Sequence, residues 1–121
     1  MDLGSLDNFC TMGTLGIEEE YFVVDSNGLP INDTEKFMSD TSYLSNRVDY
    51  ELFKFIVECS TPIASSLNEA KSSLYDMRKN MIDHAHKHNL ELSSAGLHPS
   101  AIWRELDHVT KPRYRQQLDR I

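Results

Sequence analysis

The sequence predicts a single α+β domain with a mainly antiparallel sheet. Its 121 residues fit one small domain. Two strand-like apolar runs at residues 14–24 and 52–60 precede a helical pattern that begins near Ser66, and a third strand-like run follows at 90–95. The order strand, strand, helix, strand is typical of α+β folds.

The two N-terminal strands are predicted from β-branched and aromatic residues between turn signals. Residues 14–24 end before the turn-forming pair Asn27-Gly28. Residues 29–46 are polar without periodicity, and we interpret them as a loop with room for at most a short strand. Residues 52–60 are apolar on both faces, which predicts a central strand, and Thr61-Pro62 ends it because proline cannot donate to the sheet.

The helix after Ser66 carries the clearest local signals. Ser66-Leu67-Asn68-Glu69 has the form of a capping box, and Asn89 is suited to the position after the helix end. A final helix is predicted to begin at Pro112 and to continue through Ile121, so we expect the chain to be the first part of a larger domain. The apolar stripe of the long helix comprises Leu67, Ala70, Leu74, Met77, Met81 and Ala85.

Three consecutive acids interrupt the first strand. Alternation places Glu18 and Glu20 on one face and Glu19 on the other. Two carboxylates side by side repel by about 0.2–1 kcal/mol, which a hard cation such as Mg²⁺ would offset. A solvated edge strand, made acidic to prevent aggregation, explains the spacing equally well.

A fourth acid lies in the second strand. Alternation predicts Phe53, Phe55 and Val57 on one face and Glu58 on the other, among apolar neighbours where a lone carboxylate is costly unless it is paired or bound to metal. An outward position near the strand end is the alternative. Glu51 precedes Glu58 by seven residues, so the two converge only if a bulge or turn intervenes or if the strand begins after Glu51.

Histidines and arginines offer two further candidate groups. His84 and His88 share a helix face and form a possible metal pair, but we favour a structural role for them and for His86, because cations in the last turn complement the helix dipole. Arg113 and Arg115 are the candidate catalytic residues, since guanidinium groups pair with carboxylates and phosphates. A solvated helix start is the alternative for both.

Composition excludes several functions. Twelve basic against 19 acidic residues give a formal net charge of −7, which disfavours nucleic acid as a partner. No apolar run reaches the ~20 residues of a membrane span, and the start of the chain does not resemble a signal peptide. Cys10 and Cys59 lack a metal-binding spacing and are interpreted as reduced thiols, which favours a cytoplasmic protein.

Five motifs follow one another along the chain: Thr14–Tyr21, Glu51–Lys54, Val57–Pro62, Gly96–Pro99 with Trp103, and Lys111–Arg115. Taken together, these motifs resemble the glutamate–cysteine ligases and the related carboxylate–amine ligases. The opening residues 1–9 and the segment Trp103–His108 are similar to the archaeal members in particular. The similarity covers the whole chain but about a third of a typical member.

The resemblance implies an ATP-dependent ligase. Such enzymes phosphorylate the γ-carboxylate of glutamate, and the cysteine amine then displaces phosphate to give γ-glutamylcysteine. It implies Mg²⁺ and ATP as cofactors, with Glu18, Glu20, Glu58 and Glu51 as metal ligands. It also implies a curved, mainly antiparallel sheet with helices on one face, of the glutamine synthetase and glutamate–cysteine ligase type, and residues 1–121 as the N-terminal portion of one catalytic domain.

Family members continue into strands that this sequence lacks, so we expect an incomplete sheet and no ligase activity from the 121-residue chain alone. A complementing C-terminal portion or a homo-oligomer is the expected partner. Two alternatives stay open. The chain could belong to a carboxylate–amine ligase with another amine substrate, or it could be a non-catalytic remnant that binds a partner or nucleotide.

Overall fold

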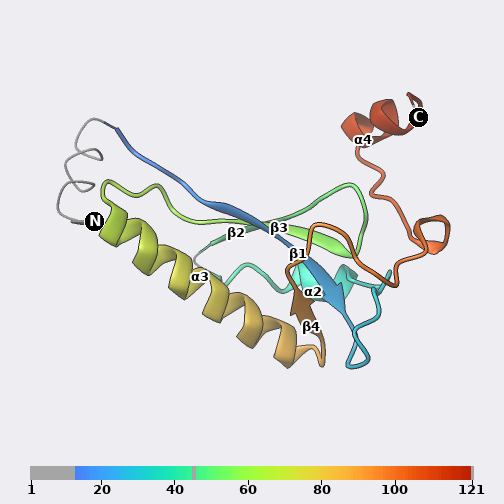
Figure 1. The fold of residues 1–121 in the computed structure, drawn as a ribbon, viewed down its shortest axis with the longest axis horizontal. Coiled ribbons are helices and arrows are strands. Elements are labelled where there is room, and N and C mark those ends of the chain that lie inside the picture. Colours follow the sequence, from blue (N-terminus) through green and yellow to red (C-terminus); the bar gives the residue numbers. More distant parts are fainter. Residues whose placement is uncertain (1–12, 45, 121) are drawn as a thin grey trace.

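The computed structural model describes residues 13–44 and 46–120, and in it four strands form one antiparallel sheet (Figure 1). The predicted α+β class is therefore confirmed. In chain order, the elements are β1 (Glu18–Val24), α2 (Glu35–Ser39), β2 (Arg47–Tyr50), β3 (Ile56–Ser60), α3 (Leu67–Lys87), β4 (Glu91–Ser93), the 3₁₀ helix η1 (Trp103–Glu105) and α4 (Pro112–Leu118).

The strands lie in the order β2-β3-β1-β4. β3 and β1 occupy the centre, and the register places Tyr21 of β1 and Tyr50 of β2 on either side of Val57. The central position predicted for the second strand is confirmed. β1 is shorter than the predicted run from Thr14, because Leu15 makes only an isolated bridge, to Ala64.

Two elements were missed between residues 29 and 50. The predicted loop at residues 29–46 contains α2, and β2 begins directly after this loop. A helix of five residues is too short to show a 3.6-residue period, and its packing depends on Phe37, which is almost completely buried in the core. β2 spans four residues and is stabilised by pairing with β3 rather than by its own sequence.

The strand predicted at 52–60 was too long. β3 begins at Ile56, and the backbone amide of Glu51 donates to the Ile56 carbonyl across the turn that joins β2 to β3. The predicted face of Phe53, Phe55 and Val57 is therefore wrong. Phe55 and Phe53 pack with Phe22 on one side of the sheet, whereas Val57 belongs to the cluster on the other side.

α3 covers one face of the sheet (Figure 1). Its N-terminus has the predicted cap, since the Ser66 side chain accepts from the Glu69 amide at 3.1 Å. Its C-terminus ends at Asn89 with φ of 56°, and the amides of Asn89 and Leu90 return to the carbonyls of His86 and Ala85. The main core lies beneath this helix and comprises Tyr21, Val23, Phe37, Val57, Cys59, Met77, Met81 and Ala85.

The other face of the sheet is divided. Near the C-terminal end of β1, Phe22 and Val24 form a second cluster with Phe55, against which Ala101 and Leu106 pack. Near the N-terminal end of β1 the same face carries acids instead. α2 and α3 thus share one face, and the chain around η1 contributes to the other.

α4 follows an extended segment, at the far end of the molecule from the start of α3 (Figure 1). Pro112 is its first residue, as predicted, but the helix ends at Leu118 with Asp119 as its C-cap rather than continuing to Ile121. Tyr114 is buried, and its hydroxyl donates to the Tyr50 carbonyl at 3.0 Å. This bond attaches α4 to the end of β2.

None of the helices in the described part of the chain combines the length and apolar composition that crossing a bilayer requires. Cys59 is a free, buried thiol, and burial raises its pKa to about 12, so it stays protonated near neutral pH. Cys10 and the opening residues 1–9 lie outside the described residues.

Candidate metal-binding face

Acidic side chains from three strands lie in one row on the face of the sheet opposite α3. The register pairs Glu20 of β1 with Glu58 of β3, and Glu58 in turn with Asp49 of β2. Directly opposed residues of antiparallel strands share a face, so the three carboxylates are neighbours. Pairing across β3 thus brings together acids that are far apart in the sequence.

Glu51 joins this row because of the turn between β2 and β3. Glu51 lies before β3 starts, so strand alternation does not place it on the opposite face from Glu58. One carboxylate oxygen from each of Glu20, Glu51 and Glu58 lies within 4.8 Å of the others. Glu51 and Glu58 therefore converge because β3 begins after Glu51, which is one of the conditions given for their convergence.

Glu18 shares this face but is not a member of that group of three. It lies opposite Ser60, whose hydroxyl is 3.4 Å from its Oε1. A surface pocket of about 680 Å³ opens beside it, lined partly by Gly16, Arg47 and Thr61. The pocket leaves room for a small molecule next to the acids.

The negative charge of Glu58 is destabilised by its surroundings on this face. Partial burial raises the pKa of its carboxyl, and Glu18, Glu51, Glu20 and Asp49 raise it further by repulsion. Glu20 is exposed, and Glu51 and Glu58 are half-buried. A bound cation would remove this repulsion, because it reverses the local field that the carboxylates experience.

The group of three fits a hard divalent cation. Mg²⁺ takes oxygen ligands at about 2.0–2.1 Å in octahedral geometry, which separates ligand oxygens by about 3.0 or 4.2 Å. The oxygens of Glu20, Glu51 and Glu58 lie within 4.8 Å of one another, so small side-chain rotations would bring them to such positions. Open positions would be filled by water or by substrate oxygens.

Comparison with known proteins assigns the chain to a family. Residues 14–121 match the model of glutamate–cysteine ligase family 2 (GCS2). The chain belongs to this family. The resemblance stated from the motifs is thereby confirmed.

Relatives in the GCS2 family include haloarchaeal proteins named glutamate–cysteine ligase. This chain is 50% identical over 124 residues to the one from Natronomonas pharaonis, and the match covers 100% of this chain and 34% of that protein. The protein of that name from Haloferax volcanii is 48% identical, with 100% of this chain and 35% of the relative covered. The GCS2 chain described here therefore spans about a third of the length of these curated relatives.

Of the two predicted catalytic arginines, the structure brings one close to the acids. The hydrogen bond to the Tyr114 hydroxyl is the main cause that raises the pKa of Arg113, and the charges of Glu51 and Glu58 raise it further. Arg115 is exposed. Because two helical positions differ by about 200° around the axis, it projects from a different side of α4 than Arg113.

Sequence reasoning missed Asp49, which the structure adds to the acidic face of this GCS2 chain. Its carboxylate pairs with Arg47 at 2.6 Å and with Lys111 at 3.7 Å. The latter contact ties the residue before α4 to β2. The alternation of Arg47-Val48-Asp49-Tyr50 was the available signal, but four residues are too few to separate a strand from a loop.

Glu19 points away from the metal-binding face, as predicted. Arg78 of α3 donates from Nε to both of its carboxylate oxygens, at 3.0 and 3.2 Å, and the Tyr21 hydroxyl donates to it as well. The bond to Arg78 is the main cause that lowers the pKa of Glu19. Glu19 therefore connects β1 to α3, and Glu18 and Glu20 are held on the opposite face.

Proposed function

We propose that this chain carries metal-binding residues of an ATP-dependent ligase that joins the γ-carboxylate of glutamate to the amine of cysteine. The observation that carries the proposal is the convergence of Glu20, Glu51 and Glu58 on one sheet face. Membership in the GCS2 family and the names of the haloarchaeal relatives support the choice of reaction.

In the proposed reaction the γ-phosphoryl group of ATP moves to the glutamate γ-carboxylate and ADP leaves. The cysteine nitrogen then forms the amide bond, loses a proton, and releases phosphate. When bound, Mg²⁺ supplies charge neutralisation for phosphate oxygens, which is the main requirement of phosphoryl transfer. Glu20, Glu51 and Glu58 hold that ion, with Glu18 beside them, and Arg113 offers a guanidinium group to a carboxylate or phosphate.

We further propose that residues 1–121 form the N-terminal portion of one catalytic domain of the glutamine synthetase-like type, whose sheet curves around the substrates. In this proposal the rest of such a domain provides the remaining strands and the residues that select the amine. The family relatives, of which the chain spans about a third, support this arrangement.

Calorimetric titration of the chain with Mg²⁺, with and without ATP, tests the metal site. We expect Glu58→Gln and Glu20→Gln to weaken Mg²⁺ binding at least about tenfold, because each removes a charged oxygen ligand. Glu91→Gln in β4 is the matched control, since it removes one acid outside the group and leaves binding unchanged. Equal affinities for the wild type and Glu58→Gln would contradict the proposed site.

Activity of the isolated chain tests the proposed division of the domain. We expect the 121-residue polypeptide, given ATP, Mg²⁺, glutamate and cysteine, to form no γ-glutamylcysteine detectable by mass spectrometry. The physical reason is that a partial site does not surround the phosphoryl group with the positioning that the transfer requires. Product formation would show that residues 1–121 are sufficient for catalysis.

A further inference from the structure

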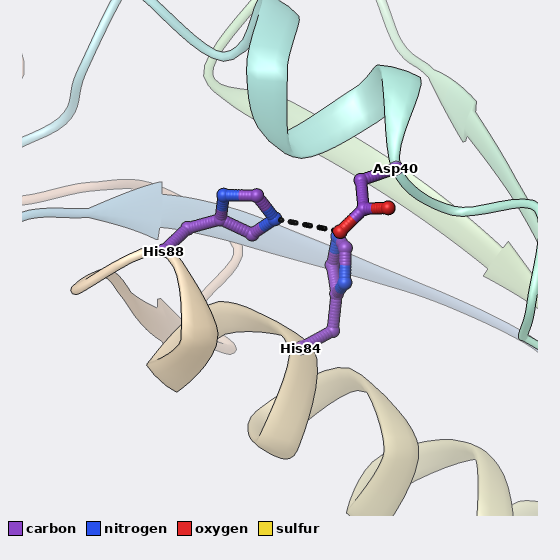
Figure 2. Close-up of side chains that lie close together, drawn as sticks. All are labelled: Asp40, His84 and His88. Carbon is purple, nitrogen blue, oxygen red and sulfur yellow. Dashed lines mark ion pairs between the residues drawn. The ribbon is translucent and has the colours of Figure 1, made fainter.

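A second group of potential metal ligands lies on the other side of the sheet, where the end of α3 meets the end of α2. Asp40 follows α2, and His84 and His88 are one turn apart on α3 (Figure 2). One ligand atom from each lies within 4.8 Å of the others. None of these residues belongs to the acidic face described above.

The ring of His88 packs edge-on against the rings of Phe37 and His84. Its side chain is 10% exposed, and its buried Nε2 has no hydrogen-bond partner among the described residues. That atom lies 3.5 Å from Oδ2 of Asp40. In a tetrahedral site with bonds of 2.0–2.2 Å, neighbouring ligand atoms are about 3.4 Å apart. The nitrogen and oxygen therefore already have the spacing of two ligands of one ion.

His84 is completely buried and has both of its ring nitrogens occupied. Nε2 contacts the Phe37 carbonyl at 2.9 Å, and Nδ1 contacts the Tyr43 hydroxyl at 2.8 Å. Since a carbonyl only accepts, Nε2 carries the hydrogen and Nδ1 accepts from Tyr43. Burial lowers the pKa of His84, which disfavours the charged ring and thus the role of dipole-complementing cation expected from the sequence.

If His84 binds an ion through Nε2, the hydrogen must move to Nδ1, and Tyr43 can keep the ring oriented in that tautomer. A hydroxyl both donates and accepts, so it can accept from a protonated Nδ1 while Nε2 gives up the Phe37 carbonyl and binds an ion. A histidine ligand usually donates its second N–H to such a partner. Asp40 and Tyr43 are both about half exposed, at 53% and 52%, which gives solvent and ions access to the group.

From this geometry we infer that Asp40, His84 and His88 form a binding site for one borderline-soft transition-metal ion of the Zn²⁺ class. Two imidazoles and one carboxylate suit Zn²⁺ or Co²⁺ in tetrahedral geometry, with water as the fourth ligand, and they do not suit Mg²⁺. The ion would join the ends of α2 and α3 beside Phe37 and thereby stabilise the core. This inference does not depend on the proposed ligase reaction.

Titration of the whole chain with Co²⁺, in buffer that contains millimolar Mg²⁺ to occupy the acidic face, tests the inference. We expect one Co²⁺ per chain with the intense visible absorption of a tetrahedral complex, and displacement of Co²⁺ by Zn²⁺. His88→Ala and Asp40→Asn should each lower the affinity by about 100-fold, and Tyr43→Phe by about tenfold. His86→Ala, which removes an exposed histidine of the same helix, should change nothing.

Circular dichroism of each variant establishes that it is folded before its affinity is compared. The inference is overturned if folded His88→Ala binds Co²⁺ as the wild type does, or if the absorption is that of an octahedral complex. It is also overturned if Glu58→Gln, rather than His88→Ala, abolishes the bound Co²⁺, because the ion would then occupy the acidic face.

Discussion

Glu58 is the residue on which the acidic face depends. It lies on the central strand β3 with acids opposite it on both neighbouring strands, Glu20 and Asp49. Burial and repulsion together raise its pKa, so in the metal-free protein its ionised form opposes folding. A residue that destabilises the free protein but can hold a cation is typical of a binding site.

The raised pKa predicts how pH affects the metal-free chain. Because the folded-state pKa of Glu58 lies above its unfolded value, its cost to stability is present at neutral pH and is relieved as pH falls through the folded-state pKa. Glu58→Gln should therefore stabilise the chain near pH 7 by about 0.5–1 kcal/mol. Urea unfolding with EDTA, from pH 7 to pH 4.5, measures the difference.

That difference should shrink as the pH falls, since wild-type Glu58 becomes neutral like glutamine. Glu91→Gln, outside the acidic group, should show no such gain near pH 7. A Glu58→Gln variant that is less stable than the wild type at pH 7 would contradict the electrostatic account of this residue.

Among the secondary-structure elements, α3 has both of its ends specified by the local sequence. Ser66 caps its start, and Asn89 ends it in the left-handed region. Between them, Arg78 fixes the helix to Glu19 of β1. Because α3 covers one face of β1 and binds Glu19 there, the acids of β1 that remain available for a ligand are those on the opposite face.

Asn89 gives a test at this scale. Its φ of 56° is costly for residues with a Cβ and costs glycine little, and asparagine tolerates it better than most. Asn89→Ala should destabilise the chain by about 1 kcal/mol, whereas Asn89→Gly should be neutral or slightly stabilising. Chemical denaturation of both variants measures this, and an equal loss in the two would exclude the backbone explanation.

For the whole molecule, the candidate site requires parts of the chain that are far apart in sequence. β1 supplies Glu20, the β2–β3 hairpin supplies Glu51 and Glu58, and α4 brings Arg113 near them. In the described part of the chain, the polar contacts that attach α4 to β2 are one hydrogen bond from Tyr114 and one ion pair from Lys111, the residue before α4. The site thus combines a sheet that packs on the main core with a helix that has few polar contacts to that sheet.

This contrast predicts a local response to Tyr114→Phe. Removing the hydroxyl leaves the partly buried Tyr50 carbonyl without this donor, at a cost of about 1 kcal/mol. We expect faster amide hydrogen exchange in residues 112–118, with exchange in β1 and β3 unchanged. Lys111→Met, which removes the longer 3.7 Å ion pair, should have a smaller effect. Uniform acceleration over the whole chain would mean that α4 belongs to the cooperative core.

The features that the sequence determined by itself are local. The Ser66 cap, the Asn89 end, the Pro112 helix start and the opposite directions of Glu19 and Glu20 depend on sterics and hydrogen bonds within a few residues, and all four are present. The ligand roles of Glu18, Glu20, Glu51 and Glu58 remain predictions from the resemblance.

Tertiary structure alone decided how the distant segments meet. α2 and β2 are too short to be stable without their partners, so residues 29–50 carried no readable period. The turn before Ile56 placed Phe55 opposite to its predicted face and brought Glu51 to Glu58. Strand pairing across β3 then added Asp49 to the row. These outcomes depend on contacts between segments, whose free energy no local pattern records.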